Sequence, residues 1–119
     1  MNFENKVVLV TGGAHGIGRA LCRAFHIEGA RVVVADKDKQ AADHVALEIN
    51  GLALAIDVSV EQEIIAAIDE AERQLGPIDI FVSNAGVAFG DGPHGAASAP
   101  DEHWRACLDV NLMAHVYAA

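Results

Sequence analysis

The chain has 119 residues, of which 52% are apolar, and its 17 acidic and 8 basic residues give a net charge of −9. The length limits it to one domain, 1–119, and the apolar share is typical of a globular protein. The acidic balance argues against nucleic acid and anionic membranes as partners, and no apolar run is long enough to span a bilayer.

The amino-terminal segment and the cysteines indicate the compartment. Met1 to Lys6 is polar and lacks the apolar core of a signal peptide, which predicts a cytoplasmic protein. Cys22 and Cys107 lie in predicted helices without pairing or metal-ligand spacing, so both are expected to be reduced and buried. His103 and Cys107 are one helical turn apart but lack further ligands, so no metal site is expected.

Short apolar runs alternate with amphipathic segments along the chain. We expect strands over 6–11, 31–36, 52–56 and 78–83, and helices from Ile17 to Gly29, from Asp38 to Asn50, and up to Leu75. This alternation predicts an α/β fold with a doubly wound parallel sheet and right-handed crossovers.

Capping residues and apolar periodicity predict how the helices begin and which sides they bury. Asp38 is placed to cap the second helix, and either Ser59 or Asp57 is placed to cap the third. The sides expected to be buried are Ile17, Leu21, Ala24, Phe25 and Glu28 on the first helix and Ile64, Ile68, Ala71 and Leu75 on the third.

The segment 86–98 contains four glycines and a proline, so a long loop is expected there. It follows the carboxyl end of a predicted strand, where open α/β sheets bind ligands. We expect a mobile loop on the substrate side, with a plain connector as the alternative. Ser98 and Asp101 resemble a capping box for a last helix that carries Trp104, Leu108 and Asn111.

A glycine-rich turn, V-V-L-V-T-G-G-A-H-G-I-G over 7–18, links the first strand to the first helix. Glycines allow a ligand to approach the backbone closely, and the amino end of a helix attracts phosphate. A tight turn without a ligand is the alternative. The phosphate loop of nucleoside triphosphatases does not fit, because Arg19 replaces its lysine and Ala20 lacks the hydroxyl that binds magnesium.

Asp36 closes the second predicted strand 18 residues after Gly18, close to the spacing at which a carboxylate binds an adenosine ribose. It would accept both ribose hydroxyls and repel a 2′-phosphate, since like charges ~4 Å apart cost roughly 4 kcal/mol at an effective dielectric near 20. NAD is therefore favoured over NADP. The alternative is a capping or merely solvated acid, and Lys37 and His15 are bases that would accommodate a phosphate.

The stretch T-G-G-A-H-G-I-G resembles the T-G-x-x-x-G-x-G fingerprint of the short-chain dehydrogenases/reductases, nicotinamide-dependent oxidoreductases with a Rossmann fold. The resemblance implies a strand order of 3-2-1-4 and NAD as the cofactor. The cofactor contacts it implies in this part of the chain are Thr11, Gly12, His15, Gly16, Ile17, Gly18, Asp36 and Lys37.

Three later elements extend the resemblance. Asp57 and Val58 match the adenine-binding pair of the family, although Asp57 is equally placed as a helix cap. The tetrapeptide S-N-A-G resembles the N-N-A-G element and implies cofactor contacts from Asn84, Ala85 and Gly86, with a serine where the family has its first asparagine. Asn111, within L-D-V-N-L, matches the catalytic asparagine that holds a water in the proton relay. A plain polar helix position is its alternative.

The family's catalytic serine, tyrosine and lysine have no counterparts. Tyr117 is the sole tyrosine, no lysine follows Lys39, and Ser98 precedes Asn111 rather than following it. We therefore expect a truncated, amino-terminal half of the fold that is inactive alone. The complete protein would transfer hydride between a secondary alcohol or ketone and nicotinamide, as a homo-oligomer. The alternative is a non-catalytic nucleotide-binding or interaction module that acts with a partner chain.

Overall fold

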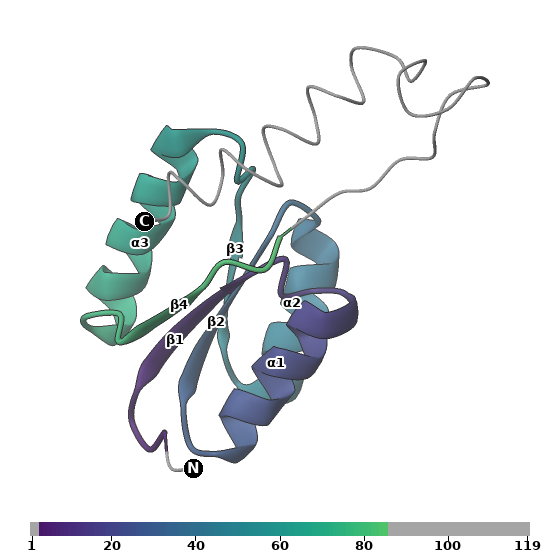
Figure 1. Ribbon diagram of the computed structural model, residues 1–119, viewed down its shortest axis with the longest axis vertical. Coiled ribbons are helices and arrows are strands. Elements are labelled where there is room, and N and C mark those ends of the chain that lie inside the picture. The colour runs from purple at the N-terminus through teal and green to yellow at the C-terminus, as the bar shows by residue number, and fades with distance from the viewer. Residues whose placement is uncertain (1–2, 86–119) are drawn as a thin grey trace, which may run out of the picture.

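The computed structural model describes residues 3–85. Along them the elements are β1 (Val7–Thr11), α1 (Gly16–Ile27), β2 (Arg31–Asp36), α2 (Lys39–Ile49), β3 (Leu52–Ala55), α3 (Glu61–Leu75) and β4 (Ile80–Val82) (Figure 1). The strands are parallel and are ordered β3-β2-β1-β4. The predicted fold class and strand order are confirmed. The loop expected over 86–98 and the helix expected after it lie outside the described residues.

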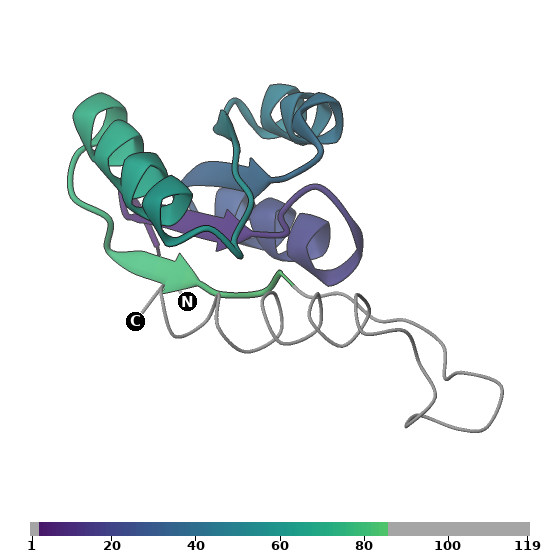
Figure 2. The same ribbon diagram turned by 90° about the horizontal axis from the view of Figure 1, so that it is seen from above.

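Helices cover both faces of the sheet, with α1 and α2 on one side and α3 on the other (Figure 2). Alternate strand residues point to opposite faces, which divides the core into two clusters. Val8, Val10, Val32 and Val34 pack with Cys22, Ala42 and Val45 of α1 and α2, whereas Val7, Leu9, Val33 and Ala35 pack with Ile64, Ala67 and Ala71 of α3. The continuous apolar runs of the inner strands follow from this, because neither face of β1 or β2 meets water.

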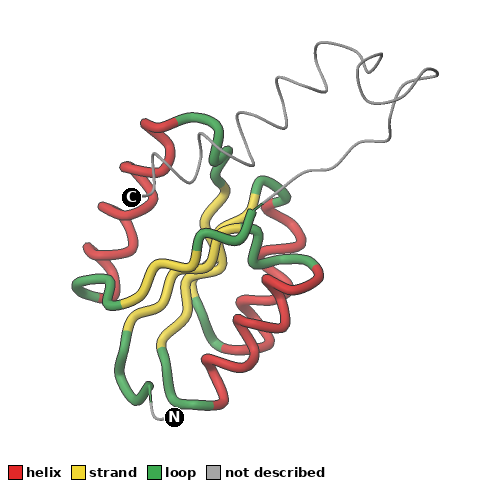
Figure 3. Tube along the Cα trace, viewed as in Figure 1, coloured by secondary structure: helices red, strands yellow, loops and turns green. Residues whose placement is uncertain are grey.

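The sheet therefore acts as a rigid base whose strands all end at the same edge (Figure 3). All five residues of β1 are buried, and burying one Val or Leu side chain is worth about 1.5–3 kcal/mol. None of the helices within 3–85 is long and apolar enough to cross a membrane.

The predicted buried side of α1 is wrong at its start. Ile17 is 74% exposed, whereas Gly18 and Cys22 are buried and Phe25 is packed against the core. The helix begins at Gly16, so Ile17 lies in its first turn at the end of the sheet. The residues that face the strands are thus spaced from Gly18 by four and then three positions, as on any helix.

The predicted cap of α3 is also wrong. Val60 is the N-cap residue and makes no side-chain cap, because Asp57 accepts hydrogen bonds from the backbone and hydroxyl of Ser59 instead. Glu61 and Glu63 in the first turn supply the negative charge that a helix amino end favours. The cap predicted for α2 is confirmed, since Asp38 accepts from the Ala41 N–H at 3.1 Å.

β4 is shorter than expected because Asp79 pairs with β1 through its side chain. Its carboxylate accepts from the Val7 N–H at 2.9 Å, while its own N–H donates to the Val7 carbonyl at 2.9 Å. The regular ladder therefore starts one residue later, at Ile80.

Candidate functional site

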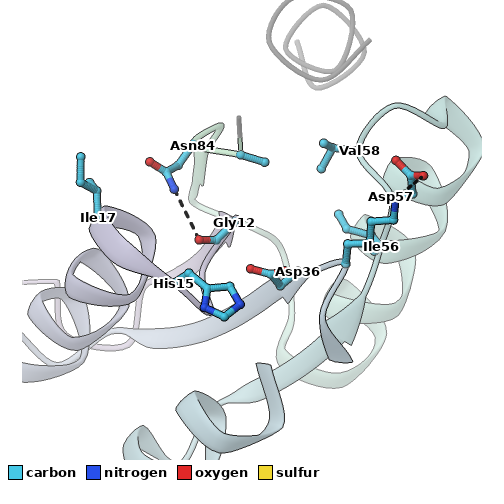
Figure 4. A pocket seen from close by; sticks show the side chains of 10 residues that line it. Gly12, His15, Ile17, Asp36, Ile56, Asp57, Val58 and Asn84 are labelled. Carbon is cyan, nitrogen blue, oxygen red and sulfur yellow. Dashed lines mark hydrogen bonds and ion pairs between the residues drawn. The ribbon is translucent and has the colours of Figure 1, made fainter. Parts of the chain in front are cut away.

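A pocket of about 420 Å³ opens where the carboxyl ends of the strands meet the amino end of α1 (Figure 4). Its lining residues come from the four segments that follow the strands: Gly12, His15, Ile17, Asp36, Lys37, Ile56, Asp57, Val58, Asn84 and Ala85. Parallel strands bring these segments to one edge although they are far apart in sequence. This is where open α/β sheets bind ligands.

The turn after β1 depends on glycine because α1 lies directly against it. A Cβ on Gly18 would stand 2.0 Å from the Gly12 carbonyl oxygen and 2.7 Å from the Asn84 amide nitrogen. Gly16 differs, since its φ is +54° and a Cβ there would meet nothing within 4 Å. One glycine thus seats the helix, and the other leaves open space at its amino end.

The amino end of α1 is left without a side-chain cap. His15 is the N-cap residue in an extended conformation, it makes no side-chain cap, and the first turn contains no acidic residue. The first N–H groups of a helix have no partners within it, and together they form a ready site for an anion. The end of α1 thus offers the pocket backbone donors rather than lysine or arginine side chains.

Asp36 is held in place by the backbone around the pocket. Its Oδ2 accepts from the Ala14 N–H at 3.1 Å and its Oδ1 accepts from the Asp38 N–H at 3.0 Å. The two bonds tie the glycine turn to the β2–α2 connection and fix the plane of the carboxylate. Each oxygen keeps a lone pair, so the group can still accept hydrogen bonds from a ligand.

Lys37 and Asp57 lie together at the side of the pocket that follows β3. Lys37 Nζ is 3.8 Å from Asp57 Oδ2, and the Lys37 side chain is 82% exposed. The pKa of Asp57 is lowered, chiefly by the hydroxyl of Ser59 at 2.6 Å, with Lys37 acting in the same direction. Asp57 therefore remains ionised at neutral pH, beside the apolar wall that Val58 provides.

A buried threonine joins the ends of β1 and β4. Thr11 is 2% exposed, and its hydroxyl donates to the Val82 carbonyl and accepts from the N–H groups of Asn84 and Ala85 at 2.9 and 3.1 Å. The Asn84 amide donates in turn to the carbonyls of Thr11 and Gly12. These bonds hold the Asn84-Ala85 backbone against the glycine turn.

Most residues predicted for the cofactor site line this pocket. Thr11, Gly16 and Gly18 are not among the lining residues; Thr11 and Gly18 shape the site from behind, while Gly16 faces open space. Gly86 and Asn111 lie outside the described residues. Sequence reasoning missed Ile56, a buried side chain that lines the pocket before Asp57. Its signal was an apolar residue at the very end of a strand, next to a polar pair.

Cys22 supports the turn from below. It is fully buried and free, and its Sγ lies 3.7 Å from the Gly13 carbonyl oxygen. Burial raises the pKa of this thiol to about 11, which keeps it protonated. The expectation of a buried, reduced cysteine is confirmed here, whereas Cys107 lies beyond the described part of the chain.

Comparison with known proteins assigns the family. A family model described as short chain dehydrogenase matches residues 6–119. Meso-2,3-butanediol dehydrogenase of Serratia marcescens is 37% identical over 125 residues, which cover 100% of this chain and 47% of that protein. NAD-dependent glycerol dehydrogenase of Listeria innocua is 36% identical over 114 residues, covering 93% and 43% of the two chains.

A solved structure agrees with these relatives. The 3-ketoacyl-(acyl-carrier-protein) reductase of Brucella melitensis, crystallised with NADH, superposes with a TM-score of 0.91 at 36% identity, covering 98% of this chain and 48% of that one. The chain spans about half the length of these relatives. Family model, sequence relatives and fold agree, and the chain belongs to the short chain dehydrogenase family of oxidoreductases.

Proposed function

We propose that this chain supplies the cofactor site of an NAD-dependent oxidoreductase that interconverts a secondary alcohol and a ketone. The observation that carries this proposal is the position of Asp36, whose carboxylate is fixed between the glycine turn and the start of the β2–α2 connection and faces the pocket. An acid at this point, next to an uncapped helix end, suits a ligand that carries both a ribose and a pyrophosphate.

The residues around the pocket fit such a dinucleotide. The open space at Gly16 and the free N–H groups of α1 suit the pyrophosphate, and Asp36 suits the adenosine ribose. Val58 offers an apolar wall for the adenine, with the Asp57 carboxylate beside it as an acceptor for the amino group. The Asn84-Ala85 backbone, held by Thr11, would border the ribose of the nicotinamide.

Several observations favour NAD over NADP. The Asp36 carboxylate would repel a 2′-phosphate on the ribose that it binds. The pocket's two basic side chains, His15 and Lys37, are both engaged by carboxylates. Among the relatives, one is called NAD-dependent and one was crystallised with NADH.

Nicotinamide dinucleotide, when bound, accepts or supplies the hydride, and the protein must position it and move a proton. We assign Asn111 to holding a water of that proton relay, as the family resemblance implies. Tyr117 is the only tyrosine and no lysine follows Lys39, so this sequence offers no tyrosine whose pKa a nearby lysine would lower. We expect the 119 residues alone to bind cofactor with negligible turnover.

Calorimetric titration of the 119-residue chain with NAD, NADP and ADP-ribose tests the site. NAD and ADP-ribose should bind, and NADP should bind more weakly. Asp36→Asn should weaken NAD binding roughly 10- to 100-fold, the value of a hydrogen bond to a charged acceptor. Asp69→Asn is the matched control, because it removes the same charge from an exposed position on α3 away from the pocket.

Two results would contradict the proposal. One is a folded chain that binds none of the three ligands. The other is an equal loss of affinity from Asp36→Asn and Asp69→Asn, which would reduce the effect of Asp36 to general charge. Sustained oxidation of a secondary alcohol with NAD by the isolated chain would overturn only the expected inactivity.

A further inference from the structure

Both basic side chains that line the pocket are already paired with carboxylates. His15 Nε2 lies 3.2 Å from Asp38 Oδ2, and Lys37 Nζ lies 3.8 Å from Asp57 Oδ2. Asp57 lines the pocket itself, but Asp38 does not. Any influence of Asp38 on a ligand in the pocket therefore passes through the side chain that it holds, which is His15.

The position of Asp38 does not depend on His15. Its Oδ1 accepts from the Ala41 N–H at 3.1 Å as the cap of α2, and its own N–H donates to Asp36 Oδ1 at 3.0 Å. The remaining oxygen, Oδ2, is the one that meets the imidazole. The Ala41 N–H, with a smaller effect of His15, holds the pKa of Asp38 below its usual value, so the group is an anion at neutral pH.

His15 is the base best placed to reach a phosphate on the adenosine ribose. Its neighbour Ala14 donates to Asp36 Oδ2 at 3.1 Å, and Figure 4 shows the imidazole beside the Asp36 carboxylate. A 2′-phosphate would enter next to Asp36 and would need a cation there to offset the repulsion. Asp38 holds the imidazole and compensates its charge, so that cation is not free.

We propose that Asp38 is a positioning residue that sets the dinucleotide preference by holding and neutralising His15. This inference rests on the proposed function of the pocket and extends it, because Asp36 then excludes the 2′-phosphate with the help of a second carboxylate that touches no ligand. A simpler role is also open to Asp38, since capping α2 would by itself make the residue necessary for a stable fold.

The variant Asp38→Asn separates these two roles. Asparagine caps helices as well as aspartate does, so α2 keeps its cap while the charge that compensates His15 is lost. We expect the ratio of NADP to NAD affinity to rise about three- to tenfold, the size of one released charge at a partly exposed site. A purely structural loss would weaken both dinucleotides equally and leave the ratio unchanged.

His15→Gln provides the matched background. In that background Asp38→Asn should change the ratio less than twofold, because the residue through which Asp38 acts is gone. His15→Gln alone should lower the ratio, since it leaves Asp38 uncompensated. The His15 side chain is 64% exposed, so this variant should fold even if Asp38→Asn does not, and it keeps the inference testable.

The outcomes distinguish this inference from the proposed function. If the unmodified chain binds neither NAD nor NADP by calorimetry, the proposed function fails. If it binds NAD but Asp38→Asn leaves the ratio unchanged, or changes it equally with and without His15, the role assigned to Asp38 is overturned. A lower ratio in His15→Gln and a higher one in Asp38→Asn would support it.

Discussion

Replacing Gly18 by alanine tests whether the contact between α1 and the glycine turn positions the site. The new Cβ would stand 2.0 Å from the Gly12 carbonyl oxygen, whereas real Cβ atoms essentially never come within 3.0 Å of such an atom. The backbone oxygen cannot rotate away, so the first turn of α1 must move by ~1 Å relative to the sheet.

Two effects of opposite sign determine the change in stability. Alanine is favoured over glycine inside a helix by about 1 kcal/mol, so propensity alone predicts a stabilised protein. Overpacking of this kind costs about 1–3 kcal/mol and occasionally more, and this contact involves rigid backbone. We expect the collision to dominate and the free energy of unfolding to fall by about 2 kcal/mol.

Urea denaturation followed by circular dichroism measures this change, which should lower the midpoint by roughly 1–2 M. Ala20→Gly is the matched control, because Ala20 is exposed on the same helix and the reverse exchange reports propensity alone. Calorimetry on folded Gly18→Ala should show at least tenfold weaker NAD binding, since α1 has moved. A Gly18→Ala protein as stable as the original, with the same NAD affinity, would refute the reasoning.

Three further outcomes are expected. Thr11→Val should lower the free energy of unfolding by about 2–4 kcal/mol in urea, because it leaves two backbone N–H groups after β4 without an acceptor, while Thr11→Ser should retain most of the stability. Because the pKa of Asp57 is lowered in the folded state, its contribution to stability is present above its ordinary pKa of 3.8 and is lost as the pH falls through the folded value. Asp57→Asn should therefore flatten the loss of stability on acidification below about pH 4, and Ser59→Ala should raise the Asp57 pKa measured by NMR; an unchanged acid limb would contradict this role. In a Cys107→Ser background, Cys22 should resist iodoacetamide at pH 8 and react once urea unfolds the chain, since burial raises its pKa to about 11; rapid labelling of the native protein would contradict its burial.

The comparison of sequence and structure is most instructive at the helix ends. Asp38 was predicted to cap α2 and does so, because its acceptor lies only three residues from the donor it meets. Asp57 was an equally good candidate for α3, yet it binds Ser59 instead. The residues are of the same type, and the difference arises from how the chain leaves β3, which the local sequence does not specify.

The first turn of α1 shows a second limit. Apolar periodicity assigned Ile17 to the buried side, but that turn extends past the sheet and exposes it at the pocket. Periodicity gives the angle of a residue around a helix, and only the packed structure tells whether a strand lies opposite.

By itself, the sequence determined the order of strands and helices, the parallel sheet and the glycine turn with Asp36 after it. These depend on apolar runs, caps and short spacings, which act between residues close together in the chain. Only the tertiary structure decided that Thr11 binds the backbone after β4, more than 70 residues away, and that Asp38 holds His15. Those contacts arise because parallel strands bring distant segments to one edge of the sheet, where side chains meet according to packing rather than sequence distance.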